Sequence, residues 1–314
     1  MASRKEFLRM SAALTAGLTL PFSLPGTARS SPISQTLDES SKVLKKGYML
    51  GTFPSRGDYS LMEQFQMLKS AGFDGAEPDS GLNRDEVMQA MEASGLEIPS
   101  VVVSTHWSHP LSSPDAETRQ TGLQGLQTAL EDADAYGAKC VLLVPGAVSR
   151  TVSYEDAWNR SQEEIRKAVP LAEELGVAIA IENVWNQFLL SPLEAARYVD
   201  AFESPAVGWY MDVGNIRNFG FADQWIRILG PRIKMVHFKE YSMQLRNQEG
   251  PGAGFRVNFL EGDKDWPAVM SALREIEYSG GYAIAEPSYR NPETDHKIWL
   301  KEYIADRMDQ IFGM

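Results

Sequence analysis

The hydrophobic positions of this chain alternate between short continuous apolar runs and longer segments with helical spacing. Eight apolar runs lack the polar alternation of half-exposed strands, so each predicts a strand buried on both faces. The segments between them carry apolar residues three and four positions apart, and many end at a glycine, as helices do. The expected strands are residues 47–53, 73–77, 98–104, 139–144, 177–181, 207–211, 233–238 and 282–285. The expected helices are residues 60–70, 83–94, 116–136, 154–175, 195–202, 222–229, 267–278 and 297–311.

Strands that alternate with helices in this way must run parallel, because each helix carries the chain back to the same end of the sheet. A single (β/α)8 TIM barrel over residues 47–314 is the economical arrangement for eight such units. An open doubly wound sheet is the alternative. The first expected strand-to-helix turn lacks the glycine-rich phosphate motif that many doubly wound nucleotide-binding folds carry there, which favours the barrel.

The first 30 residues have the pattern of an export signal. Residues 3–9 (Ser-Arg-Lys-Glu-Phe-Leu-Arg) resemble a twin-arginine motif with Lys5 in place of the second arginine. An apolar run over residues 10–24 follows, and small residues suited to cleavage come after it. An uncleaved membrane anchor is the alternative, but the run is short for a span of ~20 residues. We therefore expect export to the periplasm, with residues 31–46 as a polar linker and no stable membrane insertion after the signal is removed.

Composition argues against nucleic-acid binding and against a reactive cysteine. The formal net charge is -12, whereas sequence-independent nucleic-acid binding relies on clustered Lys and Arg. Cys140 is the single cysteine and lies in an apolar run, so it predicts a buried inert thiol. We expect no nucleic-acid partner. A homo-oligomer is compatible with the sequence, which does not decide the oligomeric state.

Acids and histidines follow six of the expected strands at or just beyond their C-terminal ends. They are Glu77, His106, Glu182, Asp212, His237 and Glu286. In a parallel barrel these ends share one face, where barrel enzymes place their chemistry. The six side chains are therefore expected to converge.

Three of the acids brought into one pocket would repel one another and take up protons unless a cation neutralised them. Glu182, Asp212 and Glu286, with the His237 imidazole, form an oxygen-rich ligand set. Such a set suits one divalent ion of Mn2+, Mg2+ or Co2+, with Zn2+ as an alternative. Each residue alone has an ordinary structural explanation as a capping or paired group. Their equivalent places on four consecutive strands favour a metal site.

The residues around these four positions resemble a known family. Residues 181–183 (Ile-Glu-Asn), 211–215 (Met-Asp-Val-Gly-Asn), 236–239 (Val-His-Phe-Lys) and 285–287 (Ala-Glu-Pro) are similar to motifs of the xylose isomerase-like TIM-barrel superfamily. The likeness is to its sugar phosphate isomerase/epimerase branch, which includes ketose 3-epimerases, hexulose phosphate isomerases and hydroxypyruvate isomerase. It covers the chain from residue 47 to the end.

The resemblance implies a metal held by Glu182, Asp212, His237 and Glu286, with a small-molecule sugar as substrate. In the ketose 3-epimerases of this family the two glutamates also act as acid and base, which makes Glu182 and Glu286 the candidate catalytic residues. A chelated cation would stabilise the enediolate formed when a proton leaves the carbon beside a carbonyl. Proton return to the same carbon gives epimerisation, and return to its neighbour gives isomerisation. The sequence does not choose between them.

Three alternative functions stay open at this point. The same site would support a metal-dependent dehydratase or lyase of a keto-sugar or inosose, in which the enediolate expels a hydroxyl group. An endonuclease IV-like nuclease shares the barrel but uses several more histidines than the four in this chain. An exported sugar-binding protein without turnover would need no paired acids around a metal.

Five further residues are expected to contact the substrate: His106, Asn215, Glu77, Trp185 and Arg246. Asn215 stands three residues after the metal-binding aspartate, where epimerases of this family usually carry a histidine, and its amide can donate to a sugar hydroxyl. For Glu77 the alternative is a structural ion pair. Arg246 would reach an anionic group of the substrate. Residues 250–254 (Gly-Pro-Gly-Ala-Gly) are expected to form a flexible loop that covers the site.

Overall fold

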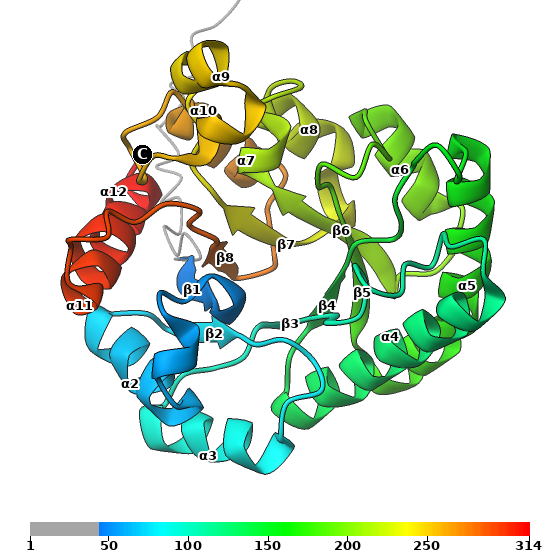
Figure 1. Ribbon diagram of the computed structural model, residues 1–314, viewed down its shortest axis with the longest axis horizontal. Coiled ribbons are helices and arrows are strands. Elements are labelled where there is room, and N and C mark those ends of the chain that lie inside the picture. The colour runs from blue at the N-terminus through cyan, green and yellow to red at the C-terminus, as the bar shows by residue number, and fades with distance from the viewer. Residues whose placement is uncertain (1–43) are drawn as a thin grey trace, which may run out of the picture. The chain divides into compact units, whose positions relative to one another are not determined.

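The computed structural model describes residues 44–314, so the expected export signal and most of the expected linker lie outside the described residues. Within that part of the chain, eight parallel strands occupy the centre and helices surround them (Figure 1). The strands are β1 Lys45–Met49, β2 Gly75–Glu77, β3 Ser100–Val102, β4 Cys140–Leu143, β5 Ala178–Glu182, β6 Val207–Asp212, β7 Ile233–Phe238 and β8 Tyr282–Ala285. This arrangement confirms the predicted TIM barrel.

The strands follow the order β2-β1-β8-β7-β6-β5-β4-β3, and each neighbouring pair in that order is parallel. The seam between β2 and β3 is closed by a shorter set of contacts. Asp79 and Val102 form an isolated parallel bridge there. The Ser80 N–H donates to the Val102 carbonyl at 2.8 Å, and the Val102 N–H donates to the Pro78 carbonyl at 2.9 Å. The barrel therefore closes through the loop after β2.

Most helices between the strands lie close to their predicted positions, whereas those at Val213–Ile216 and Met243–Glu249 were not predicted. The helices are α2 Leu61–Ala71, α3 Arg84–Ser94, α4 Ala116–Tyr136, α5 Tyr154–Leu175, α6 Pro192–Asp200, α7 Val213–Ile216, α8 Ala222–Leu229, α9 Met243–Glu249, α10 Trp266–Glu275, α11 His296–Ile298 and α12 Asp306–Phe312. A π-helical segment, Trp299–Ala305, joins the last two. None of the helices in residues 44–314 combines the length and apolar character that crossing a bilayer requires.

Local capping explains why the helices begin and end where they do. Ser60 accepts a hydrogen bond from the Glu63 N–H, and the Glu63 carboxylate accepts one from the Ser60 N–H. At the start of α6 the Ser191 side chain accepts a hydrogen bond from the Glu194 N–H, and Pro192 is the first helical residue. Gly176 ends α5 with φ 67°, a left-handed conformation that glycine adopts without steric cost. These caps place each following strand.

The chain after β7 differs from the predicted flexible loop. It forms α9 and then a short 3-10 helix over Pro251–Phe255. The Tyr241 hydroxyl donates to the Pro251 carbonyl at 2.8 Å, and the Gly254 carbonyl accepts a hydrogen bond from the Ser242 N–H. The expectation of a flexible segment at 250–254 is therefore wrong, because these bonds tie the glycine-rich stretch to the strand exit.

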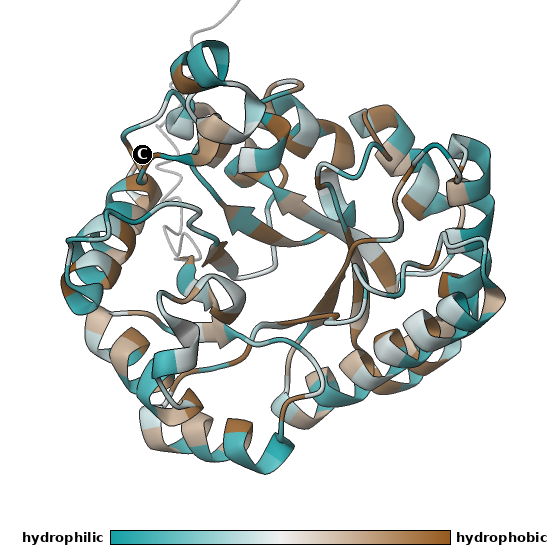
Figure 2. Cartoon of the chain, in the orientation of Figure 1, coloured by the Kyte–Doolittle hydropathy of each residue, from teal (hydrophilic) through white to brown (hydrophobic). Residues whose placement is uncertain are grey.

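The core has two parts, inside the barrel and between the strands and helices. Much of the central sheet is brown in Figure 2, because most strand residues on both faces are apolar. The barrel interior holds Val102, Cys140, Leu142, Ala180, Tyr210, Met235 and Ile284, with Val144, Tyr282 and partly buried neighbours. Successive strand residues point to opposite faces, so the residue two positions beyond an inward one also faces the interior. Strand alternation therefore decides which polar residues reach the barrel mouth.

Candidate active site

Four strands deliver the predicted ligands to the same end of the barrel. Glu182 is two residues beyond the inward-facing Ala180, and the same spacing separates Tyr210 from Asp212, Met235 from His237, and Ile284 from Glu286. One ligand atom from each of Glu182, Asp212, His237 and Glu286 lies within 4.8 Å of the others. The structure therefore brings together all four residues that the sequence pattern singled out.

Asp212 presents a single carboxylate oxygen to this centre. Its Oδ1 accepts hydrogen bonds from the backbone N–H groups of Gly214 at 2.6 Å and Asn215 at 2.8 Å, which makes it the N-cap of α7. Its Oδ2 is buried and has no hydrogen-bond partner among the described residues. A buried carboxylate oxygen without a donor is costly, so Oδ2 is suited to a cation.

His237 is oriented from behind by Glu77. The His237 Nε2 lies 2.8 Å from the Glu77 Oε2, while the Glu77 Oε1 accepts hydrogen bonds from the Ser100 and Tyr210 hydroxyls at 2.5 Å each. The His237 Nδ1 faces the centre, 3.1 Å from the Glu286 Oε2, without a hydrogen bond. A carboxylate on the far nitrogen is the usual way in which a metal-binding imidazole is held.

The expected role of Glu77 as a substrate contact needs correction. Its side chain is fully buried beneath His237 and does not line the cavity described below. The ion pair that the sequence left as the alternative is the arrangement observed. The physical reason is that both of its carboxylate oxygens are already bonded, one to the His237 ring and the other to the Ser100 and Tyr210 hydroxyls.

Lys239 enters the cluster as a residue whose place the sequence analysis missed. Its Nζ lies 2.5 Å from the Glu286 Oε1 and 3.7 Å from the Asp212 Oδ2, and 5.0 Å from the centre of the Phe255 ring. The signal was present in the alternation, because Lys239 continues the inward series of Met235 and His237.

A cavity of about 320 Å3 opens over the cluster. Its lining consists of Met49, Val102, His106, Trp107, Leu142, Glu182, Val184, Trp185, Asn215, His237, Lys239, Phe255 and Glu286. Three of the residues predicted to contact the substrate, His106, Trp185 and Asn215, line this cavity. Arg246 does not, because its Nε donates to the Asn218 Oδ1 at 3.1 Å and its Nη1 to the Asn247 Oδ1 at 2.9 Å, outside the lining. That prediction is corrected.

Polar donors and aromatic faces share the cavity wall. The His106 Nδ1 accepts from the Val144 N–H at 3.4 Å, which leaves Nε2–H as the free donor of the neutral ring. The Asn215 Nδ2 donates to the Asn183 carbonyl at 3.0 Å and approaches the Glu182 Oε1 at 3.4 Å. The Trp185 ring centre lies 5.0 Å from that of Phe255. Phe255 carried no sequence signal, because it belongs to the irregular segment after α9.

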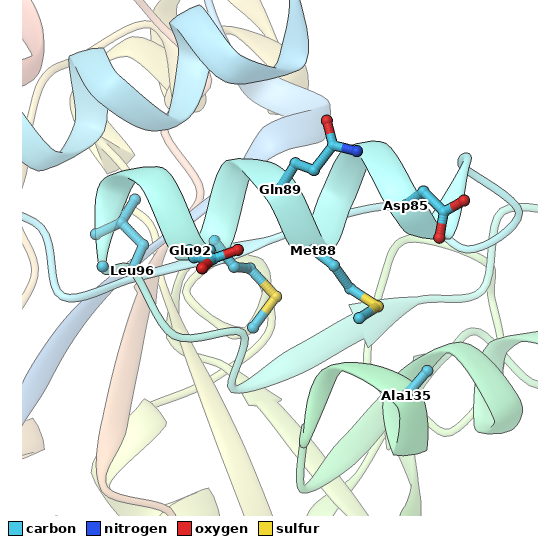
Figure 3. A pocket seen from close by; sticks show the side chains of 8 residues that line it. Asp85, Met88, Gln89, Glu92, Leu96 and Ala135 are labelled. Atoms are coloured by element: carbon cyan, nitrogen blue, oxygen red, sulfur yellow. The ribbon is translucent and has the colours of Figure 1, made fainter.

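A larger hollow, of about 610 Å3, lies away from the strand ends, on the outer helices (Figure 3). Met88 points from α3 toward α4 in this view, with Asp85 and Glu92 on the same helix. Apart from Leu96, Gly95 and Ala135, its lining comes from a single helix. It lacks the convergence of groups from several strands that marks the smaller cavity, so we place the candidate site in the latter.

Burial dominates the electrostatics of two of the ligands. It raises the pKa of Asp212 to about 7, against the opposing effect of Lys239. Burial also raises the pKa of Glu182 above its ordinary value. Burial by itself would raise the pKa of Glu286 too, but Lys239 and His237 hold it well below its usual range. The groups around these carboxylates thus supply too little positive charge for all of them to be ionised together easily.

The pKa of His237 shows the same shortage of positive charge. Burial alone lowers its pKa, but Glu77 first, and then Glu182 and Glu286, raise it well above the ordinary value. The metal-free cluster therefore draws a proton onto the imidazole. A divalent cation would satisfy the unpartnered Asp212 Oδ2, His237 Nδ1 and Glu286 Oε2 together. The residues present fit a divalent metal, because three carboxylates and one imidazole offer the oxygen and nitrogen atoms that such cations bind.

Replacing Glu77 tests the support of His237. We expect Glu77→Gln to weaken Mn2+ binding by about 10–100-fold, because loss of the carboxylate removes the group that orients the imidazole. Electron paramagnetic resonance of free Mn2+ during titration measures the dissociation constant. Glu97→Gln is the control, since Glu97 pairs with Lys45 and Tyr282 at the start of the strands. Wild-type affinity in Glu77→Gln would contradict this role.

The buried His106 imidazole predicts a pH dependence of stability. Burial lowers its pKa to about 4, whereas an unfolded chain binds this proton near pH 6.5. Stability from the neutral ring is therefore fully present above pH 6.5 and is lost as pH falls toward 4, by about 3 kcal/mol at most. Nuclear magnetic resonance should show no titration of His106 above pH 5, and His106→Gln should flatten the loss of unfolding free energy. A midpoint near 6.5 would refute the prediction.

Comparisons with known proteins agree with this geometry. A family model described as the xylose isomerase-like TIM barrel matches residues 65–303. L-ribulose-5-phosphate 3-epimerase UlaE of Escherichia coli O1:K1 is 26% identical over 237 residues, which cover 71% of this chain and 81% of that protein.

Two solved structures share the fold. The crystal structure of D-psicose 3-epimerase in the presence of D-fructose has a TM-score of 0.71 at 19% identity and covers 86% of this chain and 100% of that one. The apo form of 3-keto-D-glucoside 4-epimerase YcjR from E. coli has a TM-score of 0.70 at 19% identity, covering 85% and 99%. Since the family model spans most of the barrel, including all four candidate ligands, this chain belongs to the xylose isomerase-like TIM barrel family.

Proposed function

We propose that this protein is a divalent-metal-dependent isomerase or epimerase of a ketose or related hydroxycarbonyl sugar. The observation that carries the proposal is the cluster of Glu182, Asp212, His237 and Glu286, in which the last three each have a ligand atom without a hydrogen-bond partner in the described chain. A cavity opens over this cluster. The relatives named above are sugar epimerases, and their names agree with this assignment.

The arrangement of the two glutamates supports proton transfer at a substrate carbon. Glu182 ends β5 and Glu286 follows β8, so their carboxylates reach the cavity from strands that β6 and β7 separate. A carbon held between them would present one face to each. A divalent ion in the site would supply Lewis-acid polarisation of the neighbouring carbonyl. Glu286, which Lys239 and His237 keep ionised, is suited to remove a proton. Glu182, whose proton affinity burial increases, is suited to return one.

The cavity wall is suited to hold a sugar. The His106 Nε2–H is positioned to donate to a hydroxyl or carbonyl oxygen at the rim, and the Asn215 amide lines the same cavity. Trp107 lines the opening with 58% of its surface exposed, and Trp185 and Phe255 line it as well. Aromatic faces of this kind pack against the apolar faces of sugar rings.

We propose further that the substrate carries no phosphate. Lys239 is the one Lys or Arg among the described residues that line the cavity, and Glu286 and Asp212 already hold its ammonium group. A phosphate would therefore meet no uncommitted lysine or arginine on that lining. Free ketoses or keto-glycosides are the preferred class, whereas UlaE is named for a phosphorylated sugar.

Solvent exchange tests the proposed function. The purified protein is freed of metal by chelation and then supplied with Mn2+, Mg2+, Co2+ or Zn2+. We expect it to catalyse incorporation of deuterium from D2O at the carbon beside the carbonyl of at least one ketose or keto-glycoside. The readout is nuclear magnetic resonance of the recovered sugar, and matched phosphorylated ketoses complete the panel. Exchange with the phosphorylated member alone would reject the phosphate-free substrate. The absence of deuterium exchange with every sugar in the panel would reject the epimerase assignment.

Two variants connect that exchange to the site. We expect Glu182→Gln and Glu286→Gln each to lower the exchange rate by about 10²–10⁴-fold, the usual contribution of a positioned acid or base. Circular dichroism should show that the barrel stays folded. Glu261→Gln is the control, because Glu261 pairs with Arg307 away from the cavity. Activity that survives either substitution at the site would remove that residue from the mechanism.

Export remains a prediction from residues 1–30, and we propose the periplasm as the location. Fractionation of cells that express the full chain tests it. Recovery of the protein in the osmotic-shock fraction, dependent on Arg4, is expected, and retention in the cytoplasm would reject it.

A further inference from the structure

The candidate metal site contains more buried negative charge than a divalent cation can balance. Glu77, Glu182 and Asp212 are nine-tenths or more buried, and Glu286 has 15% of its side chain exposed. These make four carboxylates around one imidazole. Burial of unpaired carboxylates is costly, so the folded chain needs a compensating charge even before a metal arrives.

Lys239 provides that charge. Its ammonium group lies 2.5 Å from the Glu286 Oε1 and 3.7 Å from the Asp212 Oδ2, and its side chain is 10% exposed. The Phe255 ring lies on it at 5.0 Å, a cation–π arrangement. Although burial by itself lowers the pKa of Lys239, Glu286 and Asp212 raise it above the ordinary value, so the group is charged.

The backbone leaves room for this lysine. A Cβ on Gly214 would lie 2.6 Å from the Lys239 Cβ and 2.8 Å from its carbonyl oxygen. Contacts that short do not occur between real side chains, so the lysine stem passes where Gly214 has none. Gly214 is also a donor to the Asp212 Oδ1. The turn at Gly214 therefore orients Asp212 and also leaves space for Lys239.

The ammonium group divides the oxygens of Glu286 between two functions. Oε1 is bonded to Lys239, while Oε2 has no hydrogen-bond partner in the described chain and lies 3.1 Å from the His237 Nδ1. Asp212 shows the same division, with Oδ1 on backbone N–H groups and Oδ2 toward the centre. Each of these carboxylates thus has one held oxygen and one free oxygen.

We propose that Lys239 is a positioning residue of the metal centre, a built-in counter-cation that keeps the four ligands together without metal and holds Glu286 as a one-oxygen ligand. The inference rests on the proposed metal site but not on the identity of the substrate. A divalent ion takes over much of the charge compensation when it binds. Lys239 therefore stabilises the metal-free protein more than the metal-bound protein, and its charge opposes the cation.

The variant Lys239→Met removes the charge and keeps the length of the stem. Without metal, we expect its Tm to fall by about 5–10 °C relative to wild type, the consequence of leaving buried carboxylates unpaired. Saturating Mn2+ should restore the Tm to within about 3 °C of wild type. The Mn2+ dissociation constant should fall by about tenfold, because the repulsion between ammonium and cation is gone. Differential scanning calorimetry and electron paramagnetic resonance of Mn2+ measure these two quantities on the full chain.

Lys46→Met is the matched control. Lys46 is also a largely buried lysine, with 12% of its side chain exposed and its Nζ 2.6 Å from Asp309, but far from the cavity lining. Its Tm change should be the same with and without Mn2+, and its Mn2+ affinity should be that of wild type. A purely structural lysine at 239 would behave like this control.

Three results would overturn the inference: an unchanged metal-free Tm in Lys239→Met, no additional stabilisation by Mn2+, or weaker Mn2+ binding. If Lys239→Met does not fold under either condition, Lys239→Arg decides the question. It keeps the charge, so it should fold without metal and bind Mn2+ within about threefold of wild type. Failure of the arginine variant to fold would show that side-chain shape, not charge, is what the site requires. Absence of sugar exchange with Mn2+ binding as predicted would reject the proposed function alone.

Discussion

Compensation of buried negative charge at one end of the barrel is the constraint on which the site depends. Four largely buried carboxylates, from Glu77, Glu182, Asp212 and Glu286, surround His237. Because isolated carboxylates are poorly tolerated when buried, every other polar contact of the site serves to pair, orient or neutralise them. The backbone turn after β6 and the Lys239 ammonium group both do so while leaving oxygens free. Metal binding is the natural completion of such a site.

The barrel makes this concentration of charge tolerable because it spreads the ligands over separate strands. Each ligand is held by the register of its own strand and by a partner below or beside it, so repulsion cannot push the four apart without breaking the sheet. His237 is an example, with Glu77 beneath it and the Ser100 and Tyr210 hydroxyls in turn supporting Glu77. The fold therefore holds the four ligand residues closer together than their mutual repulsion would allow in an unconstrained chain.

Sequence reasoning failed where contacts cross between elements that lie far apart along the chain. Glu77 and Arg246 both looked like pocket residues, but the first is buried against His237, and Asn218 and Asn247 hold the second outside the lining. The stretch at 250–254 looked flexible, because glycine content reports conformational freedom and not the bond from Tyr241 that restrains it. Phe255 became a wall of the cavity through that same packing.

The sequence by itself determined the alternation of strands and helices, hence the parallel barrel, and the appearance of acids and a histidine at strand ends. It could do so because periodicity, capping and strand polarity are local properties. Only the tertiary structure decided that His237 leans on Glu77, that Lys239 sits among the acids, and which side chains line the cavity. Those outcomes depend on strand heights and distances across the barrel, and no local pattern contains that information.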